Sequence, residues 1–358
     1  MYKKMAFSDM IYNERKKEEL RMFLIIDGSS MLSSSYYGNL PKQILFAKTE
    51  EERAKHYDKI MHAPDGTYTN GIFTMLRTVL KILKNQKPDH IAFVFDKTRN
   101  TFRRKLYTDY KGTRGETPAP LKQQFILAEE MFQEMGFPVF FSDEYEADDF
   151  AGSIAEKFWQ QESIVLMTKD VDYLQLVSDE RNIRAWMVQV SQDKADRLFA
   201  AYQVDKERTN LPDKVFEFTE AYIEGEYGLS SGNMVIDWKA LAGDSSDNIP
   251  GVKGISDKSA IPLLNEYHTV ETLYEALKEE GPGIENFWKE SMGLRKGSYK
   301  KLTAPGAKEL ALLSKQLATI KRDIPITEEL SYFICKPNKD GFLRMVERFG
   351  FQSLKEEL

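Results

Sequence analysis

The chain has 358 residues, of which 42% are hydrophobic and 12% aromatic, enough apolar material for one large domain or two closely joined ones. The single cysteine, Cys335, excludes an internal disulfide framework, and the four histidines show no zinc-ligand spacing with it, so any metal ion must be held by oxygen. No apolar run approaches the roughly 20 residues of a membrane helix, and no signal core is present, which favours a cytoplasmic protein.

Four short runs rich in β-forming residues alternate with segments of helical periodicity. The runs cover residues 22–26, 90–95, 138–141 and 163–167, and helices are predicted at 71–83 and 121–135. This alternation is typical of a parallel sheet covered by helices. We expect a charged extension at 1–20, an α/β core at 21–186 with an insert at 41–64, a variable segment at 187–233 and a helical region at 234–358.

Acidic residues follow three of the predicted strands. Asp27 ends the first, Asp96 ends the second, and Asp170 and Asp172 follow the fourth. A single aspartate after a strand is most often a turn or helix-capping residue. Because the carboxyl ends of parallel strands meet at one edge of the sheet, where ligands bind, we expect these side chains to converge.

Two further acidic groups lie outside the strands. Glu146, Asp148 and Asp149 open a predicted helix, where the helix dipole favours acids, yet three acids in four residues repel one another unless a cation holds them. Asp244 and Asp247 lie in or beside a turn.

The candidate acids number nine in total, and without them the net charge of the chain would be +3 instead of −6. All-oxygen ligands favour Mg²⁺ or Mn²⁺, and two such ions are suited to phosphate-ester hydrolysis.

The segment 97–119 is basic and contains aromatic residues. It holds seven Lys or Arg against two acids, together with Phe102, Tyr107 and Tyr110. A run of charged residues more often forms a solvated surface of a helix or loop. This run, however, begins directly after Asp96, one of the candidate acids. Positive charges for phosphates and aromatic faces for bases predict a single-strand path above the acids.

The sequence NIPGVKGISDKSA at 248–260 predicts a glycine hairpin between two helices. Gly251 and Gly254 permit a tight turn, and Ser256 can cap the following helix. Backbone N–H groups beside a helix N-terminus can bind phosphate without regard to base sequence. An ordinary helix connection would look similar, but Lys253 and Lys258 favour phosphate binding.

Six motifs resemble, in order and spacing, the bacterial 5′→3′ exonuclease and flap endonuclease family over most of residues 22–267. They are DGSS at 27–30, FR at 102–103, YKGTR at 110–114, YEADD at 145–149, TKDVDYLQL at 168–176 and GDSSDNIPGVKGISDKSA at 243–260. The last motif is very specific, whereas DGSS alone would be weak. The chain resembles the N-terminal 5′-nuclease domain of DNA polymerase I, and we expect a stand-alone form because no polymerase sequence follows.

The resemblance implies a resolvase-like, PIN-related α/β core, a helical arch at about 97–119 and a C-terminal helix-three-turn-helix DNA-binding subdomain. It implies a monomeric, nucleoid-associated enzyme that hydrolyses phosphodiester bonds at 5′ ends, nicks and flaps of DNA, RNA-primed ends included, in replication and repair. The implied cofactors are two Mg²⁺ ions, for which Mn²⁺ can substitute, and a K⁺ ion at the hairpin.

The resemblance also implies roles for particular residues. The first metal group is Asp27, Asp96, Glu146, Asp148 and Asp149, and the second is Asp170, Asp172, Asp244 and Asp247. Lys111 and Arg114 match arch residues that approach the scissile phosphate, and Arg103 matches the base of the arch, which makes these three the catalytic candidates. The DNA-binding candidates are Tyr110, Gly251, Lys253, Gly254, Ser256 and Lys258.

Two positions depart from the family pattern. Ser33, Ser34 and Ser35 stand where the family usually places an arginine, and Ser256 replaces the second glycine of the hairpin. Two other functions fit these motifs less well. A non-catalytic hairpin DNA-binding protein predicts gaps in the acid set, and a haloacid-dehalogenase-type phosphatase requires paired acids after the first strand, where Gly28 and Ser29 stand instead.

Overall fold

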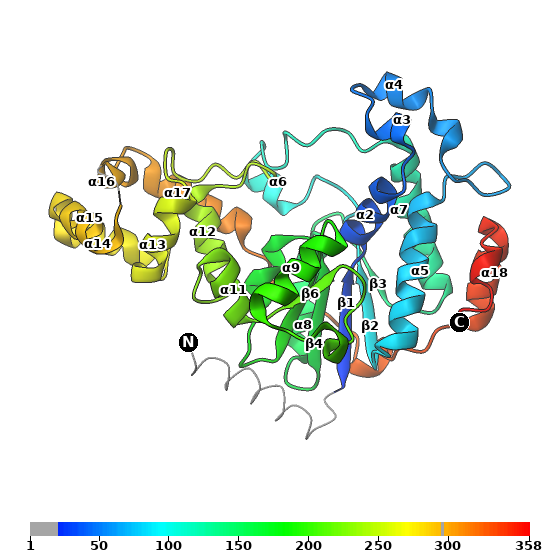
Figure 1. The fold of residues 1–358 in the computed structure, drawn as a ribbon. Helices are drawn as coiled ribbons and strands as arrows, with labels where there is room; N and C mark the ends of the chain where they lie inside the picture. The colour runs from blue at the N-terminus through cyan, green and yellow to red at the C-terminus, as the bar shows by residue number, and fades with distance from the viewer. Residues whose placement is uncertain (1–20, 295–296) are drawn as a thin grey trace.

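The computed structural model describes residues 21–294 and 297–358, so the predicted extension at 1–20 lies outside the described residues. Its centre is a six-stranded sheet with the order β3-β2-β1-β4-β5-β6 (Figure 1). The strands are β1 (Met22–Asp27), β2 (His90–Val94), β3 (Val139–Phe140), β4 (Ser163–Thr168), β5 (Ile183–Val188) and β6 (Val215–Phe218). The predicted parallel pairing is confirmed for β1 to β5, whereas β6 pairs antiparallel with β5. The sequence predicts neither β5 nor β6.

Helices cover both faces of this sheet (Figure 1). The longer ones are α2 (Gly28–Gly38), α5 (Asn70–Asn85), α7 (Ala119–Glu134), α8 (Ala147–Phe158), α9 (Gln192–Tyr202) and α11 (Glu220–Tyr227). The shorter ones are α3 (Lys42–Leu45), α4 (Glu50–Ala54), η1 (Tyr57–Lys59), α6 (Phe102–Leu106), η2 (Val171–Leu176) and α10 (Lys206–Thr209). The insert at 41–64 thus forms α3, α4 and η1, which lie beside the end of α2 (Figure 1).

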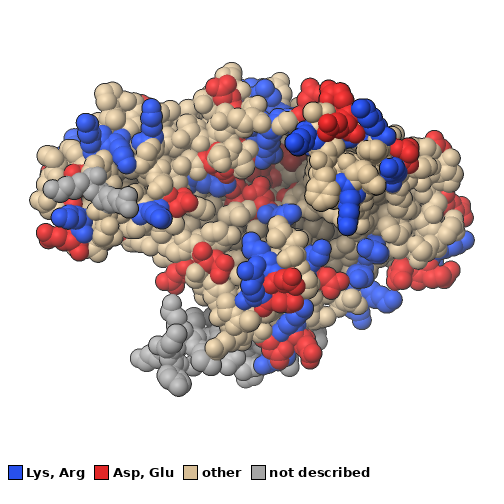
Figure 2. All heavy atoms as spheres, turned by 45° about the horizontal axis from the view of Figure 1, so that its top comes forward, with Lys and Arg blue, Asp and Glu red and all other residues tan. Residues whose placement is uncertain are grey.

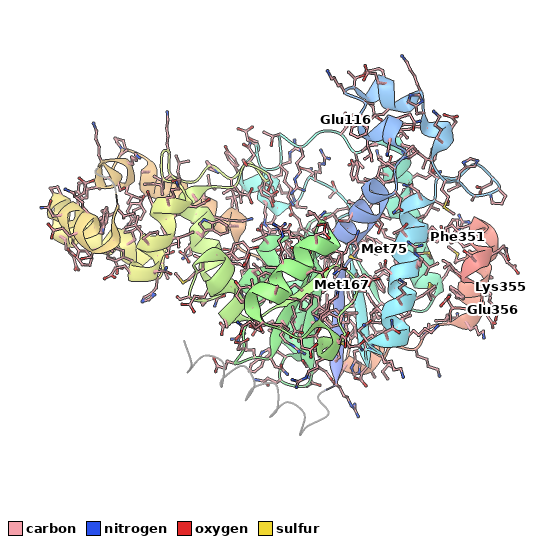
Figure 3. The ribbon with its side chains drawn as sticks, viewed as in Figure 1. Met75, Glu116, Met167, Phe351, Lys355 and Glu356 are labelled. Carbon is pink, nitrogen blue, oxygen red and sulfur yellow. The ribbon has the colours of Figure 1, made fainter. Side chains whose placement is uncertain are left out.

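Alternate side chains of the central strands build two separate cores. In β1, Leu24 and Ile26 pack with side chains of α2, α5 and α7, whereas Phe23 and Ile25 pack with those of α8. This follows from the period-two geometry of a strand. Met75 of α5 and Met167 of β4 lie together in the first core (Figure 3). Both faces of the central strands are therefore covered, and the open end of the sheet is left for the site.

A helical region extends from the β6 side of the molecule (Figure 1). It contains α12 (Met234–Ala242), α13 (Asp257–Tyr267), α14 (Val270–Glu280), η3 (Gly281–Gly283), α15 (Ile284–Met292), α16 (Ser298–Leu302) and α17 (Ala307–Ala318). These helices share a hydrophobic core that continues to Phe216 and Phe218 of β6. No helix within the described ranges is long and apolar enough to span a membrane.

The C-terminal residues, expected as helices at the end of the region 234–358, return to the α/β core. They form η4 (Leu330–Phe333), α18 (Lys339–Phe349) and η5 (Gln352–Leu354). Phe342 and Val346 of α18 are buried in the same core as α7, and the ring of Phe351 lies 5.1 Å from that of Phe73 on α5 (Figure 3).

The predicted arch crosses above the carboxyl ends of the strands (Figure 1). Its only regular element in the described chain is α6, a helix of five residues, and turns and irregular backbone follow up to α7. Glu116 lies on this span (Figure 3).

Candidate active site

The carboxyl end of β1 places Asp27 at the N-terminus of α2. Its carboxylate accepts hydrogen bonds from the Ser30 N–H at 2.9 Å and from the Thr168 hydroxyl at 2.7 Å. Burial, followed by the nearby charge of Asp96, raises the pKa of Asp27 to about 7. The side chain therefore resists ionisation unless a cation approaches it.

Asp96 follows β2 and is joined to the start of α8. Its carboxylate accepts a hydrogen bond from the Ala147 N–H at 2.9 Å, and its own N–H donates to Ser29 Oγ at 2.7 Å. Asp148 comes from the first turn of α8, and its buried Oδ1 has no hydrogen-bond partner among the described residues. Burial raises the pKa of Asp148 well above its usual range.

Glu146, the N-cap of α8, is satisfied by three side-chain donors. It accepts hydrogen bonds from the Thr101 hydroxyl at 2.8 Å, the Tyr110 hydroxyl at 3.2 Å and the Lys111 ammonium at 2.5 Å. Burial opposes its ionisation, but the charges of Lys111 and Arg103 outweigh burial and lower the pKa of Glu146 to about 2.

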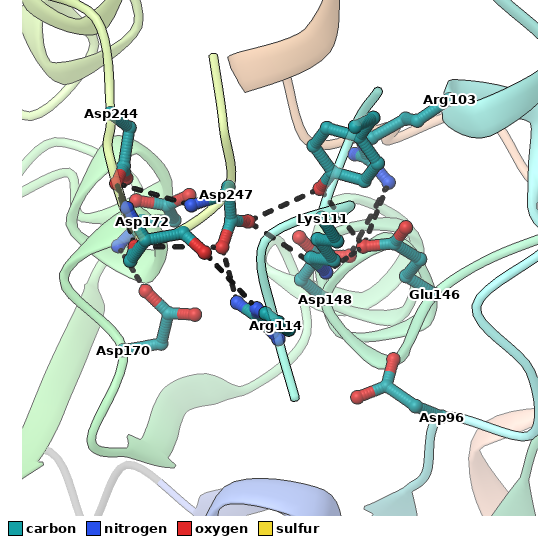
Figure 4. Close-up of polar contacts among 12 residues, drawn as sticks. Asp96, Arg103, Lys111, Arg114, Glu146, Asp148, Asp170, Asp172, Asp244 and Asp247 are labelled. Carbon is teal, nitrogen blue, oxygen red and sulfur yellow. Dashed lines mark hydrogen bonds and ion pairs between the residues drawn. The ribbon is translucent and has the colours of Figure 1, made fainter. Parts of the chain in front are cut away.

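The second group forms where β4 and α12 end. Asp170 is the N-cap of η2 and accepts a hydrogen bond from the Asp172 N–H at 3.0 Å. Lys239 of α12 is buried and lies between two of the acids, bonded to Asp172 and, at 2.5 Å, to Asp244. Figure 4 shows the two groups on either side of Lys111 and Arg114, with Asp96 and Asp148 on one side and Asp170 and Asp172 on the other.

Two basic residues of the arch fold down onto the acids. Lys111 donates to Glu146, and its ammonium lies 3.7 Å from Asp247. Arg114 bonds to Asp247 and to the Ser246 carbonyl. Figure 2 shows a hollow in the middle of this face, with acidic atoms on its floor and basic side chains along its rim. Both residues are therefore placed within the site, as their motif predicts.

The side chains as placed do not enclose an ion. Within residues 21–294 and 297–358, no three acidic, histidine or cysteine side chains lie in a suitable cluster. The physical reason is that Lys111, Arg114 and Lys239 occupy positions between the carboxylates. The donor set nevertheless fits a hard cation, because it consists of oxygens only and includes Oδ1 of Asp148, a buried oxygen without a hydrogen-bond partner among the described residues.

The position of Arg103 corrects its expected catalytic role. Its side chain is 1% exposed, and it donates to both oxygens of Asp149 at 2.8 and 2.7 Å and to the carbonyls of Leu317 and Thr319. Asp149 accepts further hydrogen bonds from the Glu146 and Lys321 N–H groups. The polar atoms of both side chains are therefore used in hydrogen bonds that stabilise the fold. These bonds disagree with a phosphate contact for Arg103 and with metal ligation by Asp149.

Tyr110 is also placed differently from the expectation. It is 2% exposed, and its hydroxyl donates between Glu146 and Asp247 at 3.2 Å from each. A ring this deeply buried cannot stack on a nucleobase. Tyr110 instead ties the arch to both acidic groups.

The hairpin between α12 and α13 presents backbone and lysines to solvent. Gly251 has a φ of +60°, and a Cβ there would lie 2.3 Å from the Gly243 nitrogen, so the turn requires glycine. Gly254 likewise has a φ of +84°, and its carbonyl accepts a hydrogen bond from Lys301 at 2.8 Å. Lys253 and Lys258 are exposed. Ser256 is the N-cap of α13, but its side chain makes no capping hydrogen bond, which corrects the expected capping contact.

Sequence reasoning missed three residues of the site. Lys239 and Thr168 contact the acids directly, and Lys301 contacts the hairpin. A signal existed for Lys239 only, because a lysine interrupts the apolar stretch that ends at Asp244. Thr168 ends a strand, and Lys301 lies in a lysine-rich segment, and neither pattern is distinctive.

Comparisons with known proteins identify families and structures that this chain resembles. The family described as "5'-3' exonuclease, N-terminal resolvase-like domain" matches residues 22–209, and "5'-3' exonuclease, C-terminal SAM fold" matches residues 231–340. DNA polymerase I of Bacillus caldotenax is 28% identical over 340 residues, which are 94% of this chain and 32% of the polymerase. The chain thus spans about a third of the length of the polymerases that it matches.

Two solved structures of a phage T5 protein have the same fold. The T5 5′-exonuclease with bound zinc has a TM-score of 0.56 at 20% identity, covering 83% of this chain and 89% of that chain. The T5 D15 flap endonuclease in a pseudo-enzyme-product complex with DNA and metal ions has a TM-score of 0.53 at 19% identity, with the same coverage.

Proposed function

The chain belongs to the 5′-3′ exonuclease family, and we propose that it is a metal-dependent hydrolase that cuts phosphodiester bonds at the 5′ ends and 5′ flaps of DNA. The observation that carries this proposal is the convergence of acids at one edge of the sheet. They come from the ends of β1, β2 and β4, the start of α8 and the turn after α12, and they lie beneath basic residues of the arch.

The acids divide into two ligand groups. Asp27, Asp96, Glu146 and Asp148 would hold one divalent ion, and Asp170, Asp172, Asp244 and Asp247 would hold the other. Oxygen ligands favour Mg²⁺, with Mn²⁺ as a substitute. When bound, the ions supply positive charge that activates the attacking water and stabilises the leaving oxygen. Asp149 is absent from this set because Arg103 occupies both of its oxygens.

Lys111 and Arg114 act on the phosphate that is cut. In the structure they pair with Glu146 and Asp247, and divalent ions held by these acids would compete with them for the carboxylates. Once displaced, both cations remain tethered to the arch above the same edge. There they can bind the phosphate and stabilise the charge that develops during attack.

The hairpin binds duplex DNA away from the cut. Exposed Lys253 and Lys258, together with the backbone of the tight turn, suit phosphates irrespective of base sequence. A K⁺ ion bound at the Gly254 carbonyl would have to share it with Lys301. We further propose that the protein acts as a monomer near the nucleoid, on nicked, flapped and RNA-primed ends. A non-catalytic role is disfavoured because none of the four strand-end acids, Asp27, Asp96, Asp170 and Asp172, is missing.

The test is Asp148→Asn, compared with Asp213→Asn, whose exposed side chain pairs with Lys81 and belongs to neither acidic group. Asp148→Asn should abolish Mg²⁺-dependent cleavage of end-labelled flap, nicked and blunt duplexes. Its affinity for DNA should be unchanged or higher, because negative charge leaves the phosphate path. Asp213→Asn should cut normally. Normal cutting by Asp148→Asn, or full cutting in EDTA, would refute the metal-dependent proposal.

A further inference from the structure

A buried tyrosine hydroxyl in η2 is not explained by the fold. Tyr173 is 1% exposed, and its hydroxyl has no hydrogen-bond partner among the described residues. Leaving a buried hydroxyl unpaired costs about 1–3 kcal/mol. The ring alone would fill the same space without that cost, so packing does not account for the oxygen.

The elements that surround Tyr173 carry the acids of the site. The residue directly follows Asp172, and its ring belongs to one hydrophobic cluster with Ala147 and Ala151 of α8, the helix that carries Asp148. A tyrosine hydroxyl ordinarily keeps its proton at neutral pH, so it is available as a hydrogen-bond donor.

A second polar atom without a hydrogen bond belongs to the first acidic group. Asp148 Oδ1 is buried, has no hydrogen-bond partner among the described residues and lies 3.8 Å from the Arg103 guanidinium. It can accept hydrogen bonds or bind a cation. A hydrated cation would satisfy the Tyr173 donor and this oxygen together. Mg²⁺ retains several of its waters when it binds to proteins, so such a cation brings acceptor oxygens with it.

We propose that Tyr173 is a positioning residue that donates a hydrogen bond to a hydration water of the divalent ion held around Asp27 and Asp148. This inference rests on the proposed metal-dependent function. Tyr173 would act through the water rather than on the DNA. Contacts of this kind around metal ligands typically contribute about 10- to 100-fold in metal affinity.

The test uses two variants that make the same chemical change. Tyr173→Phe removes the proposed contact, and Tyr274→Phe removes another buried, unpaired hydroxyl from α14, outside the acidic groups. In Mn²⁺ titrations without DNA, followed by electron paramagnetic resonance, Tyr173→Phe should raise the Kd about 10-fold. Tyr274→Phe should match the wild type. Neither variant should lower the melting temperature of the metal-free protein, because neither hydroxyl has a hydrogen-bond partner in residues 21–294 and 297–358.

The possible results separate this inference from the proposed function. A wild-type protein that neither binds Mn²⁺ nor cuts DNA would overturn both. If the wild type does both and Tyr173→Phe binds Mn²⁺ as tightly as Tyr274→Phe, only the role of Tyr173 is overturned. A lower metal-free melting temperature for Tyr173→Phe alone would assign the hydroxyl to the fold and also overturn it. As an independent readout, 3-fluorotyrosine at position 173 should show a ¹⁹F shift on Mg²⁺ addition, and no shift would contradict the contact.

Discussion

Charge compensation inside the protein divides the acids of the site into two kinds. Glu146 and Asp244 each have a lysine ammonium within hydrogen-bonding distance, and the pKa of each is lowered to about 2. Asp27 has no such cation among the described residues, and burial raises its pKa to about 7. Single residues thus determine which carboxylates are ionised before a metal ion arrives.

Metal binding should depend on pH through Asp27. Below its pKa of about 7 the carboxyl holds a proton that the ion must displace. We expect Mn²⁺ affinity to rise about tenfold per pH unit up to 7. Isothermal titration between pH 5.5 and 8.5 measures this, and a flat profile would contradict it.

The same pKa predicts the stability of the metal-free protein. The unfolded carboxyl ionises near 3.8 and the folded one near 7, so the folded state binds the proton more tightly. The Asp27 carboxyl therefore contributes to the free energy of unfolding below about pH 4, and this contribution is lost as the pH rises to 7. The wild-type melting temperature should fall more steeply over that range than that of Asp27→Asn, and equal slopes would count against the shift.

The roles of Arg103 and Lys111 can be separated by mutation. Arg103→Met leaves Asp149 buried and unpaired, and should cost about 3–5 kcal/mol of unfolding free energy. Lys111→Met should cost less stability but lower the single-turnover cleavage rate at saturating enzyme, because charge at the cut phosphate is lost. Urea denaturation and quenched-flow cleavage measure the two effects. Wild-type stability with slow cutting for Arg103→Met would instead restore a catalytic role.

At the scale of elements, the residues proposed to act in the site lie at the ends of strands and helices. The ends of β1, β2 and β4 and the start of α8 bring acids to one edge of the sheet, and the turn after α12 adds two more. The same turn continues into the hairpin, where α13 begins. One connected segment therefore contributes both to the second acidic group and to the proposed duplex contact.

Lys258, near the start of α13, should contribute to duplex affinity and not to chemistry. Lys258→Ala should weaken binding equally for different base sequences and reduce the slope of log affinity against log salt by about one unit. Lys355→Ala changes an exposed lysine at the opposite side of the molecule and should do neither (Figure 3). Fluorescence anisotropy at several salt concentrations provides the measurement, and slower cleavage by Lys258→Ala at saturating enzyme would contradict the assignment.

At the scale of the whole molecule, the segment after α17 joins the two regions. The Leu317 and Thr319 carbonyls accept hydrogen bonds from Arg103, and the Lys321 N–H donates to Asp149, so this segment is bonded to the base of the arch and to α8. The chain then passes beneath the sheet and ends in α18 against α7 (Figure 1). The α/β core is therefore completed by residues from the far end of the sequence.

The substitution Phe342→Ala tests whether α18 is part of the hydrophobic core of the α/β region. It is fully buried in α18, and Phe342→Ala should lower the unfolding free energy by about 3–5 kcal/mol. Phe287→Ala makes the same change at a ring that is 41% exposed and should cost much less. Chemical denaturation measures both variants. Equal and small losses would show that α18 is not part of the cooperative core.

The sequence by itself determined the local elements and the list of acids. Four of the six strands, helices α5, α7 and α8 and the glycine hairpin follow from apolar periodicity and turn residues, which are properties of neighbouring positions. The convergence of Asp27, Asp96 and Asp170 was predictable as well, because parallel strands place their carboxyl ends at one edge.

Only the tertiary structure decided how the charged side chains pair and which strands complete the sheet. Arg103 matches a catalytic motif, but its partners include Asp149 and carbonyls more than 200 positions away, and these contacts bury it. The same holds for Tyr110, Lys239 and α18, whose partners are distant in sequence. A residue type specifies which interactions are possible, whereas burial and partner distance, set by the whole chain, decide which of them form.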